Sequence, residues 1–191
     1  MNILVMIYHA VLFSIFMIFL IISGQKLPSG YMFFDNTISA LGSRFGNPHG
    51  WIYFSIATII LAIGLMFSIT YMWSFFKLTF LLKLSYVVEI MGCIGIIIIA
   101  VFDDSTRIHT VTAYITYVLF ILGIFVVAVC FLFKGEIHPE TIVAVLLLLF
   151  IYIVGSILVS LDLFSIEHQE WLVTICLLLF VIYISGTICD L

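Results

Sequence analysis

Residues 142–159 read IVAVLLLLFIYIVGSILV, a stretch without a charged side chain. As an α-helix it would be about 27 Å long, close to the roughly 30 Å thickness of the hydrocarbon core of a bilayer. Its Leu, Ile, Val and Phe residues favour insertion into a membrane by roughly 6 kcal/mol. We therefore predict a transmembrane helix over residues 141–161, and the same pattern recurs along the chain.

Five further apolar runs are long enough to cross a bilayer. They are residues 3–24, 51–73, 78–102, 108–133 and 171–188. The chain is 65% hydrophobic and 8% charged, whereas a soluble domain is about 45–50% apolar and about 25% charged. The excess apolar surface must face lipid. We predict an all-α, polytopic membrane protein in which residues 1–191 form a single domain, a bundle of six transmembrane helices.

The charges indicate how the chain is oriented and what it does not bind. The net charge is -4 and Lys and Arg do not cluster, so the sequence indicates no nucleic-acid partner. Six crossings would place both termini on the same side, and each side carries three basic residues. Because Lys77 and Lys83 lie close to two helix ends, we expect both termini to be cytoplasmic.

The connection between the first two runs, roughly residues 25–50, is the one long loop. Its middle, YMFFDNTISALG, is half apolar and aromatic, which argues against disorder. Long ordered loops in compact proteins are usually functional. Asp35, Ser39 and His49 are its candidate ligand-binding residues.

Six crossings would also gather carboxylates and imidazoles on one face of the membrane. The first, third and fifth connections carry Asp35, His49, Asp103, Asp104, His109, Asp162, Glu167, His168 and Glu170. Such groups bind divalent metals or relay protons. The alternative is that these are ordinary acidic loop residues that bind nothing.

Within this set, VFDDSTRIH is the most specific segment. Asp103 and Asp104 end the third run and His109 opens the fourth, so the three are candidate metal ligands or catalytic residues. The alternative is a helix–turn–helix in which Asp104 or Ser105 caps the next helix. No HExxH-like spacing is present, so the sequence names no cofactor.

Glu89 is a carboxylate near the middle of the third run. At that depth it must face protein or a cavity, and it is therefore a further catalytic candidate. The alternative is a protonated packing residue. We expect it to be buried and bonded to a neighbouring helix, and the candidate partners are Thr58, Thr112, Tyr114, Thr116 and Tyr117.

Several other residues have a structural interpretation. His9 is predicted to be a polar packing residue within the first run. Trp51, Trp73 and Trp171 stand at the ends of runs, where indoles commonly anchor at the level of the lipid headgroups.

Three blocks together resemble a known family. They are FDNTISALGSRFGNPHGWIYFSIATIILAIGLM, IMGCIGIIIIAVFDDSTRIHTVTAYITYVLF and FSIEHQEWLVTICLLLF. Their order and spacing are similar to those of the domain of unknown function 998 family and, more distantly, of the Frag/DRAM/Sfk group of six-helix membrane proteins.

The resemblance implies six helices and a shared polar mouth built from the loops. The matching positions are Ser39, Gly42 and Pro48 in the first block, Asp103 or Asp104 and His109 in the second, and Glu170 in the third. The family's GLxER pattern departs here to IEHQEW, which lacks the arginine. The resemblance implies no particular reaction.

Three functions are consistent with the sequence, in this order. The first is binding of a lipid or small molecule in a loop-covered polar pocket that includes Ser39, His168 and Glu170, by analogy with the association of the more distant group with lipid metabolism. The second is a structural or accessory subunit of a larger membrane complex. The third is an intramembrane metal-dependent hydrolase that uses the Asp103, Asp104 and His109 set, with His168 as a further candidate. Whether the protein is an enzyme is left open.

Overall fold

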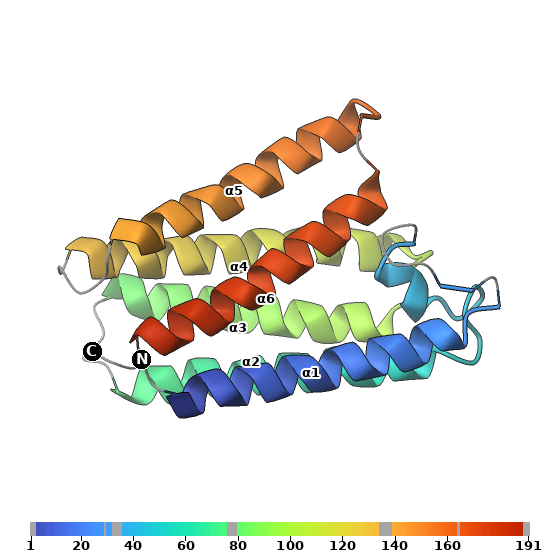
Figure 1. Ribbon diagram of the computed structural model, residues 1–191, viewed down its shortest axis with the longest axis horizontal. Coiled ribbons are helices and arrows are strands. Elements are labelled where there is room, and N and C mark those ends of the chain that lie inside the picture. Colours follow the sequence, from blue (N-terminus) through green and yellow to red (C-terminus); the bar gives the residue numbers. More distant parts are fainter. Residues whose placement is uncertain are drawn as a thin grey trace.

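The computed structural model describes residues 3–28, 30–31, 36–75, 80–133, 139–163 and 165–188 (Figure 1). Within these residues the chain forms six α-helices and one short 3-10 helix. They are α1 (Ile3–Gln25), η1 (Ser39–Gly42), α2 (Trp51–Phe75), α3 (Phe80–Val101), α4 (Arg107–Phe133), α5 (Pro139–Ser160) and α6 (Ile166–Ile188). Four of them, α1 to α4, are long and apolar enough to cross a membrane. The predicted all-α, polytopic membrane fold is confirmed.

The last helix begins earlier than the apolar pattern indicated. It begins at Ile166, and not at Trp171, because Ser165 caps it: the Ser165 hydroxyl accepts a hydrogen bond from the amide of His168 (3.3 Å). Glu167 in the first turn also suits the positive end of the helix dipole. Glu167, His168 and Glu170 therefore lie on helix α6 and not in a loop.

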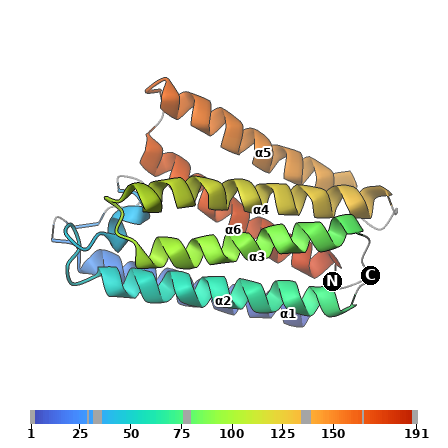
Figure 2. The same ribbon diagram turned by 180° about the vertical axis from the view of Figure 1, so that it is seen from behind.

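Helices α3 and α4 approach each other closely at glycines. A Cβ added to Gly95 would lie 2.1 Å from the Thr116 Oγ1, and one added to Gly123 would lie 2.5 Å from the Cγ of Glu89. Small residues let membrane helices approach to backbone distance. Both views show α1 to α4 running alongside one another (Figures 1 and 2).

His9 joins α1 to α2 inside the bundle and is fully buried. Its Nδ1 lies 2.9 Å from the Val5 carbonyl oxygen, and its Nε2 lies 2.9 Å from the Ser68 hydroxyl. Because a carbonyl only accepts, Nδ1 carries the hydrogen and Nε2 of the neutral ring accepts from Ser68. The interpretation of His9 as a polar packing residue is confirmed, with both ring nitrogens bonded.

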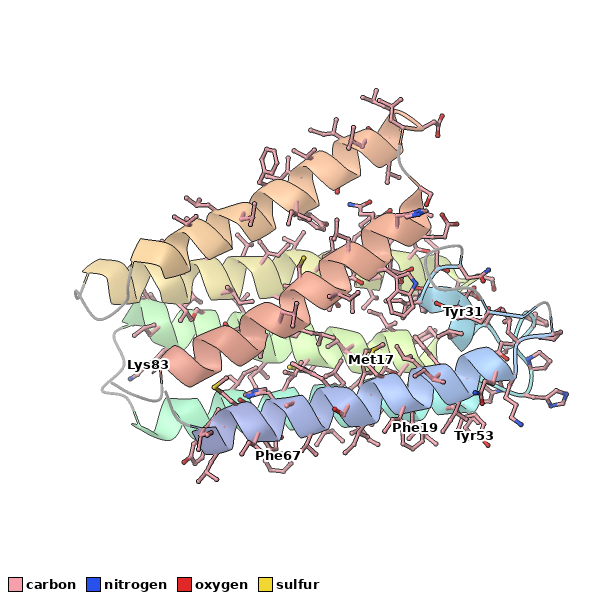
Figure 3. The ribbon with its side chains drawn as sticks, in the orientation of Figure 1. Met17, Phe19, Tyr31, Tyr53, Phe67 and Lys83 are labelled. Carbon is pink, nitrogen blue, oxygen red and sulfur yellow. The ribbon has the colours of Figure 1, made fainter. Side chains whose placement is uncertain are left out.

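Helix α5 diverges from this arrangement. It tilts away from α4 toward the end of the bundle where η1 lies, and α6 crosses the other helices at an angle (Figures 1 and 2). A hydrogen bond between side chains links α5 to α6: the Nε2 of Gln169 on α6 donates to the hydroxyl of Ser156 on α5 at 2.7 Å. The outer surface carries large apolar side chains, such as Phe67, which is 69% exposed (Figure 3). Such a surface suits contact with lipid.

The long first connection is held to α1 by buried hydrogen bonds. Asn47 is fully buried, and its Nδ2 donates at 3.1 Å to the Ser23 carbonyl, the Ser23 hydroxyl and the Leu41 carbonyl. The Ser23 hydroxyl in turn donates to the Gly50 carbonyl at 2.9 Å. These bonds satisfy backbone groups that would otherwise be buried without partners, and they position η1 over the end of the bundle.

Candidate functional site

Three connections meet at the end of the bundle that η1 covers (Figure 1). Ser39, the first residue of η1, donates to Oε1 of Glu170 from its hydroxyl (2.6 Å) and from its amide (3.2 Å). The amide of Arg44 donates to Oδ2 of Asp103 at 2.6 Å. The first connection is therefore tied to the start of α6 and to the turn between α3 and α4 by charge-assisted bonds.

The expected membrane anchors behave differently from one another. Trp171 is only 1% exposed, its Nε1 donates to the Asn36 carbonyl at 3.0 Å, and its ring packs against that of Tyr31. The prediction of a headgroup anchor is wrong for Trp171, which instead holds the first connection against α6. Trp51 opens α2 with the Arg44 guanidinium 4.6 Å from its ring centroid. The Trp73 side chain lies outside the described part of the chain.

Asp103 organises the turn between α3 and α4. Its Oδ1 accepts from the hydroxyl (2.6 Å) and the amide (3.1 Å) of Ser105. Burial raises the pKa of Asp103, but these bonds and the Arg44 amide outweigh burial and lower the pKa to about 2. The cap of α4 is Thr106, whose hydroxyl accepts from the His109 amide at 3.3 Å. In the alternative interpretation of this segment as a helix–turn–helix, the expected cap, Asp104 or Ser105, was therefore the wrong residue.

His109 and Asp104 present acceptor atoms that the described residues leave unbonded. His109 is 2% exposed, and its Nδ1 lies 2.9 Å from the Phe102 carbonyl oxygen. Nδ1 therefore carries the hydrogen, and Nε2 of the neutral ring is an acceptor. Nε2 of His109 and Oδ1 of Asp104 are both buried without a hydrogen-bond partner in the described structure. Burial is also the main reason that the pKa of Asp104 is raised.

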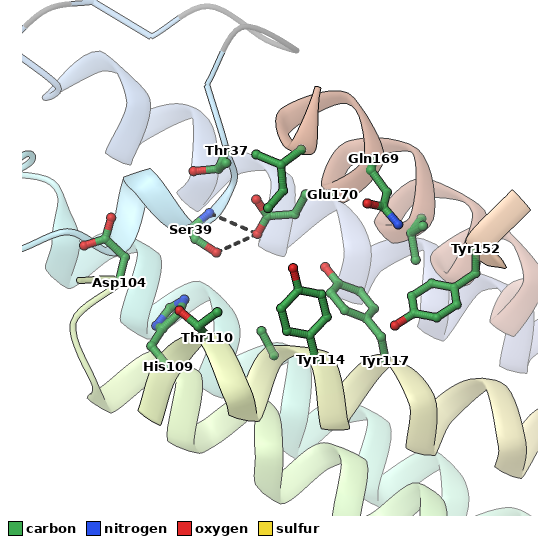
Figure 4. A pocket seen from close by; sticks show the side chains of 13 residues that line it. Thr37, Ser39, Asp104, His109, Thr110, Tyr114, Tyr117, Tyr152, Gln169 and Glu170 are labelled. Atoms are coloured by element: carbon green, nitrogen blue, oxygen red, sulfur yellow. Dashed lines mark hydrogen bonds between the residues drawn. The ribbon is translucent and has the colours of Figure 1, made fainter. Parts of the chain in front are cut away.

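These groups surround a cavity of about 230 Å³, which we call the loop-end cavity (Figure 4). Its lining residues come from the first connection, the α3–α4 turn, α4, α5 and α6. They are Thr37, Ser39, Asp104, His109, Thr110, Ala113, Tyr114, Tyr117, Tyr152, Ile166, Gln169, Glu170 and Val173. In Figure 4 the ring of His109 points from α4 toward Ser39. Four of the sequence-predicted residues, Ser39, Asp104, His109 and Glu170, thus line one space.

Three tyrosines of this lining were missed by the sequence reasoning as site residues. Tyr114 and Tyr117 lie on α4, and Tyr152 lies on α5. Together with Thr110, the two α4 tyrosines have the spacing i, i+4, i+7, which places them on one helix face. That polar face in an apolar helix was the signal that could have found them. Gln169, one residue before Glu170, was missed in the same way.

Other candidates lie elsewhere. His49 and His168 are exposed and are not among the residues lining the cavity. Asp103 also does not line it, and Asp35 lies outside the described residues. Among the residues that the structure describes, no group of three or more His, Cys, Asp or Glu side chains could hold a metal ion. The predicted metal group of Asp103, Asp104 and His109 is therefore not formed.

Glu89 is 7% exposed, and its predicted burial is confirmed. It packs against Gly123 of α4. Within the described part of the chain, the expected hydrogen bond to Thr58, Thr112, Tyr114, Thr116 or Tyr117 is not found. Glu89 is not among the residues lining the loop-end cavity. The site around Ser39 is therefore separate from this carboxyl group.

A second cavity of about 120 Å³, the inner cavity, extends between the helices. Its lining is mainly apolar: Phe16, Ile38, Ser39, Phe54, Thr58, Leu61, Leu65, Ile96, Ile99, Ala113, Thr116, Tyr117, Phe120, Ile124, Glu170, Thr174, Leu177, Leu178 and Val181. Ser39, Ala113, Tyr117 and Glu170 line both cavities. The Ser39–Glu170 pair therefore stands at the boundary between a space with polar groups and an apolar one.

A family model described as "Protein of unknown function (DUF998)" matches residues 10–186. The chain belongs to this family. No curated protein and no solved structure matches the chain. This match confirms the resemblance of the three sequence blocks to the family. The matched region also includes every residue that lines the two cavities.

Proposed function

We propose that this DUF998 protein binds a single-chain amphiphile taken from the bilayer. The observation that carries the proposal is the shared wall of the two cavities at Ser39 and Glu170. An amphiphile has the same division, with a polar head that suits the loop-end cavity and a hydrocarbon chain that suits the inner cavity. The head would hydrogen-bond to polar side chains, and the chain would gain the free energy of burying apolar surface.

The size of the cavities favours one chain. The cavities measure about 230 Å³ and 120 Å³, so each is smaller than a usual ligand pocket of about 300–1,000 Å³, and only the two together reach the small end of that range. A two-chain phospholipid would need more enclosed space. A fatty alcohol, amine or similar molecule is the better fit.

The edge of the loop-end cavity offers a route from the membrane. Tyr114 on α4 is 51% exposed and Ile166 on α6 is 45% exposed, and both line the cavity. This edge lies beside α5, which diverges from α4 at this end (Figure 1). A ligand could therefore enter sideways from lipid.

A photoreactive hexadecanol carrying a diazirine tests the proposal. In nanodiscs, the probe should crosslink to residues of the inner cavity. Ala113→Leu should reduce this labelling by about tenfold, because the added side chain fills the space that joins the two cavities. Ala10→Leu makes the same change on an exposed part of α1 and should leave labelling unchanged. Equal labelling of both variants would refute the site and would favour the accessory-subunit interpretation.

The orientation of the site in the membrane is a separate proposal. With both termini cytoplasmic, the loop-end cavity faces the other side of the membrane. Cysteines introduced at Ser43, Ser105 and Ser165, one in each connection, should all react with a membrane-impermeant maleimide added from outside the cell. Labelling of any one of them only from the cytoplasmic side would refute this orientation or the predicted six crossings.

A further inference from the structure

We propose that the ligand of the loop-end cavity carries a protonated primary amine as its head. This inference rests on the proposed amphiphile site and names its ligand class. It follows from which hydrogen-bonding atoms and which charges the cavity presents.

The cavity presents acceptors. Nε2 of His109 accepts because Nδ1 of the same ring already donates to the Phe102 carbonyl. This nitrogen is unbonded within the described structure, as is Oδ1 of Asp104. The carboxylate of Glu170 lies across the same cavity. Glu170 already accepts two bonds from Ser39, so the unbonded acceptors are those of His109 and Asp104. A ligand that satisfies these two must supply at least two donors, because a buried acceptor without a partner costs free energy.

The two carboxyl groups of the cavity, those of Asp104 and Glu170, have no Lys or Arg beside them among the described lining residues, and His109 is the one imidazole in that set. The Arg44 guanidinium is used elsewhere, since it donates to the Val101 carbonyl at 2.8 Å and stacks on Trp51. A phosphate or carboxylate head would meet like charge here, whereas protein phosphate sites supply Arg, Lys or free amides.

At the nearby helix start, two of the amides are already bonded. In the first turn of α6 the His168 amide donates to the Ser165 hydroxyl and the Gln169 amide donates to the Ser165 carbonyl. Glu167 adds a negative charge to the same turn. Anion binding at this helix start is therefore disfavoured, although helix starts commonly attract anions.

The tyrosines add a second reason to expect a cation. Tyr114, Tyr117 and Tyr152 line the cavity side by side (Figure 4). Aromatic faces attract ammonium groups through their quadrupole. A primary ammonium has three N–H donors, which suits the acceptors of Asp104, His109 and Glu170. A quaternary ammonium has none, and a single alcohol has one.

Competition among ligands with one chain and different heads tests the inference. The wild-type protein in phosphatidylcholine nanodiscs is labelled with the diazirine hexadecanol in the presence of hexadecylamine, hexadecanol, hexadecyltrimethylammonium, palmitate or hexadecyl phosphate. We expect hexadecylamine to compete at a concentration about tenfold lower than hexadecanol, and the two anions to compete least. Labelling of Ala113→Leu gives the background from partition into the nanodisc.

The variant Asp104→Asn tests whether Asp104 causes the preference for hexadecylamine over hexadecanol. The change keeps the shape of the side chain and removes its charge, so the advantage of hexadecylamine over hexadecanol should fall by about tenfold. Glu167→Gln removes a charge from α6 outside the cavity lining and should leave the preference unchanged.

The outcomes separate the two proposals. If hexadecanol and every other ligand fail to compete in the wild-type protein, the amphiphile site itself is refuted. If hexadecanol competes but hexadecylamine is no better, or an anion or the quaternary amine is best, the amine head is refuted and the site stands. An unchanged preference in Asp104→Asn also refutes the amine head.

Discussion

The α3–α4 interface and the α5 region of this bundle are packed in different ways. At Gly95 and Gly123, between α3 and α4, an added Cβ would lie within 3.0 Å of a side chain of the opposite helix, so the packing would have to shift. A Cβ added to Gly155 of α5 would instead lie 3.4 Å from the Cγ of Gln169, which is an ordinary contact distance. Side chains packed directly onto glycines therefore fix α3 against α4, whereas the Gln169–Ser156 hydrogen bond holds α5 against α6.

The loop-end cavity lies where these two kinds of packing meet. One wall, with His109, Tyr114 and Tyr117, belongs to α4 of the close pair. The opposite wall, with Tyr152 and Glu170, belongs to α5 and α6. A cavity in this place has one wall set by close helix packing and another held by a few polar bonds.

The largest loss of stability is expected outside both of these parts, from Asn47→Asp in the first connection. The Asn47 Nδ2 donates to three acceptors around Ser23 and Leu41, and a carboxylate would place acceptors against acceptors. The free energy of unfolding should fall by about 3 kcal/mol or more, since unmade buried bonds cost about 1–3 kcal/mol each and more when charged. Unfolding in mixed micelles with increasing sodium dodecyl sulfate measures it. A change below about 1 kcal/mol would contradict the role of Asn47 as the main anchor.

The next effect compares two glycines directly. Gly95→Leu should lower the free energy of unfolding by about 1–3 kcal/mol, because α3 and α4 must separate to admit the side chain. Gly155→Leu, the matched control, should cost less, because a Cβ there lies at ordinary contact distance from the flexible Gln169 side chain and because leucine favours a helix over glycine. The same unfolding titration applies. Equal effects at both positions would remove the distinction between the two parts of the bundle.

A smaller effect is expected from Ser156→Ala, at the α5–α6 contact. The change removes the acceptor of the Gln169 amide, and it should cost about 0.5–1.5 kcal/mol. Ser160→Ala is a suitable control, because the exposed Ser160 hydroxyl bonds only within its own helix. If Ser156→Ala were as harmful as Gly95→Leu, α5 would be held as firmly as α3 and α4.

The smallest effect concerns pH. The pKa of Asp103 is lowered to about 2, from an ordinary value of about 3.9. The folded state therefore binds this proton less tightly than the unfolded state, and the stabilisation is present above about pH 4 and is lost as pH falls toward about 2. Between about pH 2 and 5, the melting temperature of the wild-type protein should fall more steeply with decreasing pH than that of Asp103→Asn. An identical pH profile in both proteins would contradict the role of Asp103 in the turn.

The number of helices could be predicted from the sequence because the length of an apolar run directly reflects bilayer thickness. The start of α6 could not, since Glu167, His168 and Glu170 interrupt the apolar pattern although Ser165 caps a helix there. Ser39, Asp104, His109 and Glu170 were found because polar residues are rare in this chain. Their grouping into one cavity depends on how the loops fold over the bundle. The type of each residue does not predict that path.

The sequence also did not reveal how each helix is rotated about its own axis. The helices are apolar on nearly all faces, so the sequence does not say which face points inward. Glu89 was correctly expected to be buried, but its neighbour is Gly123 and not a hydroxyl. Trp171 was misplaced for the same reason, because a residue at a helix end can face lipid or protein.

The two residue pairs that bond the first connection to α6 have a consequence for biogenesis. Ser39 and Glu170 are 131 positions apart along the chain, and Asn36 and Trp171 are 135 apart. Membrane helices emerge from the ribosome in order, so α1 and the loop that follows it are synthesised long before α6. The cover of the cavity must wait for the last helix before it can be fixed, and contacts of such separation form late. A ribosome-stalled chain that ends before α6 would therefore carry an open, unattached cover, and protease protection of the first loop should appear only once α6 has been released into the membrane.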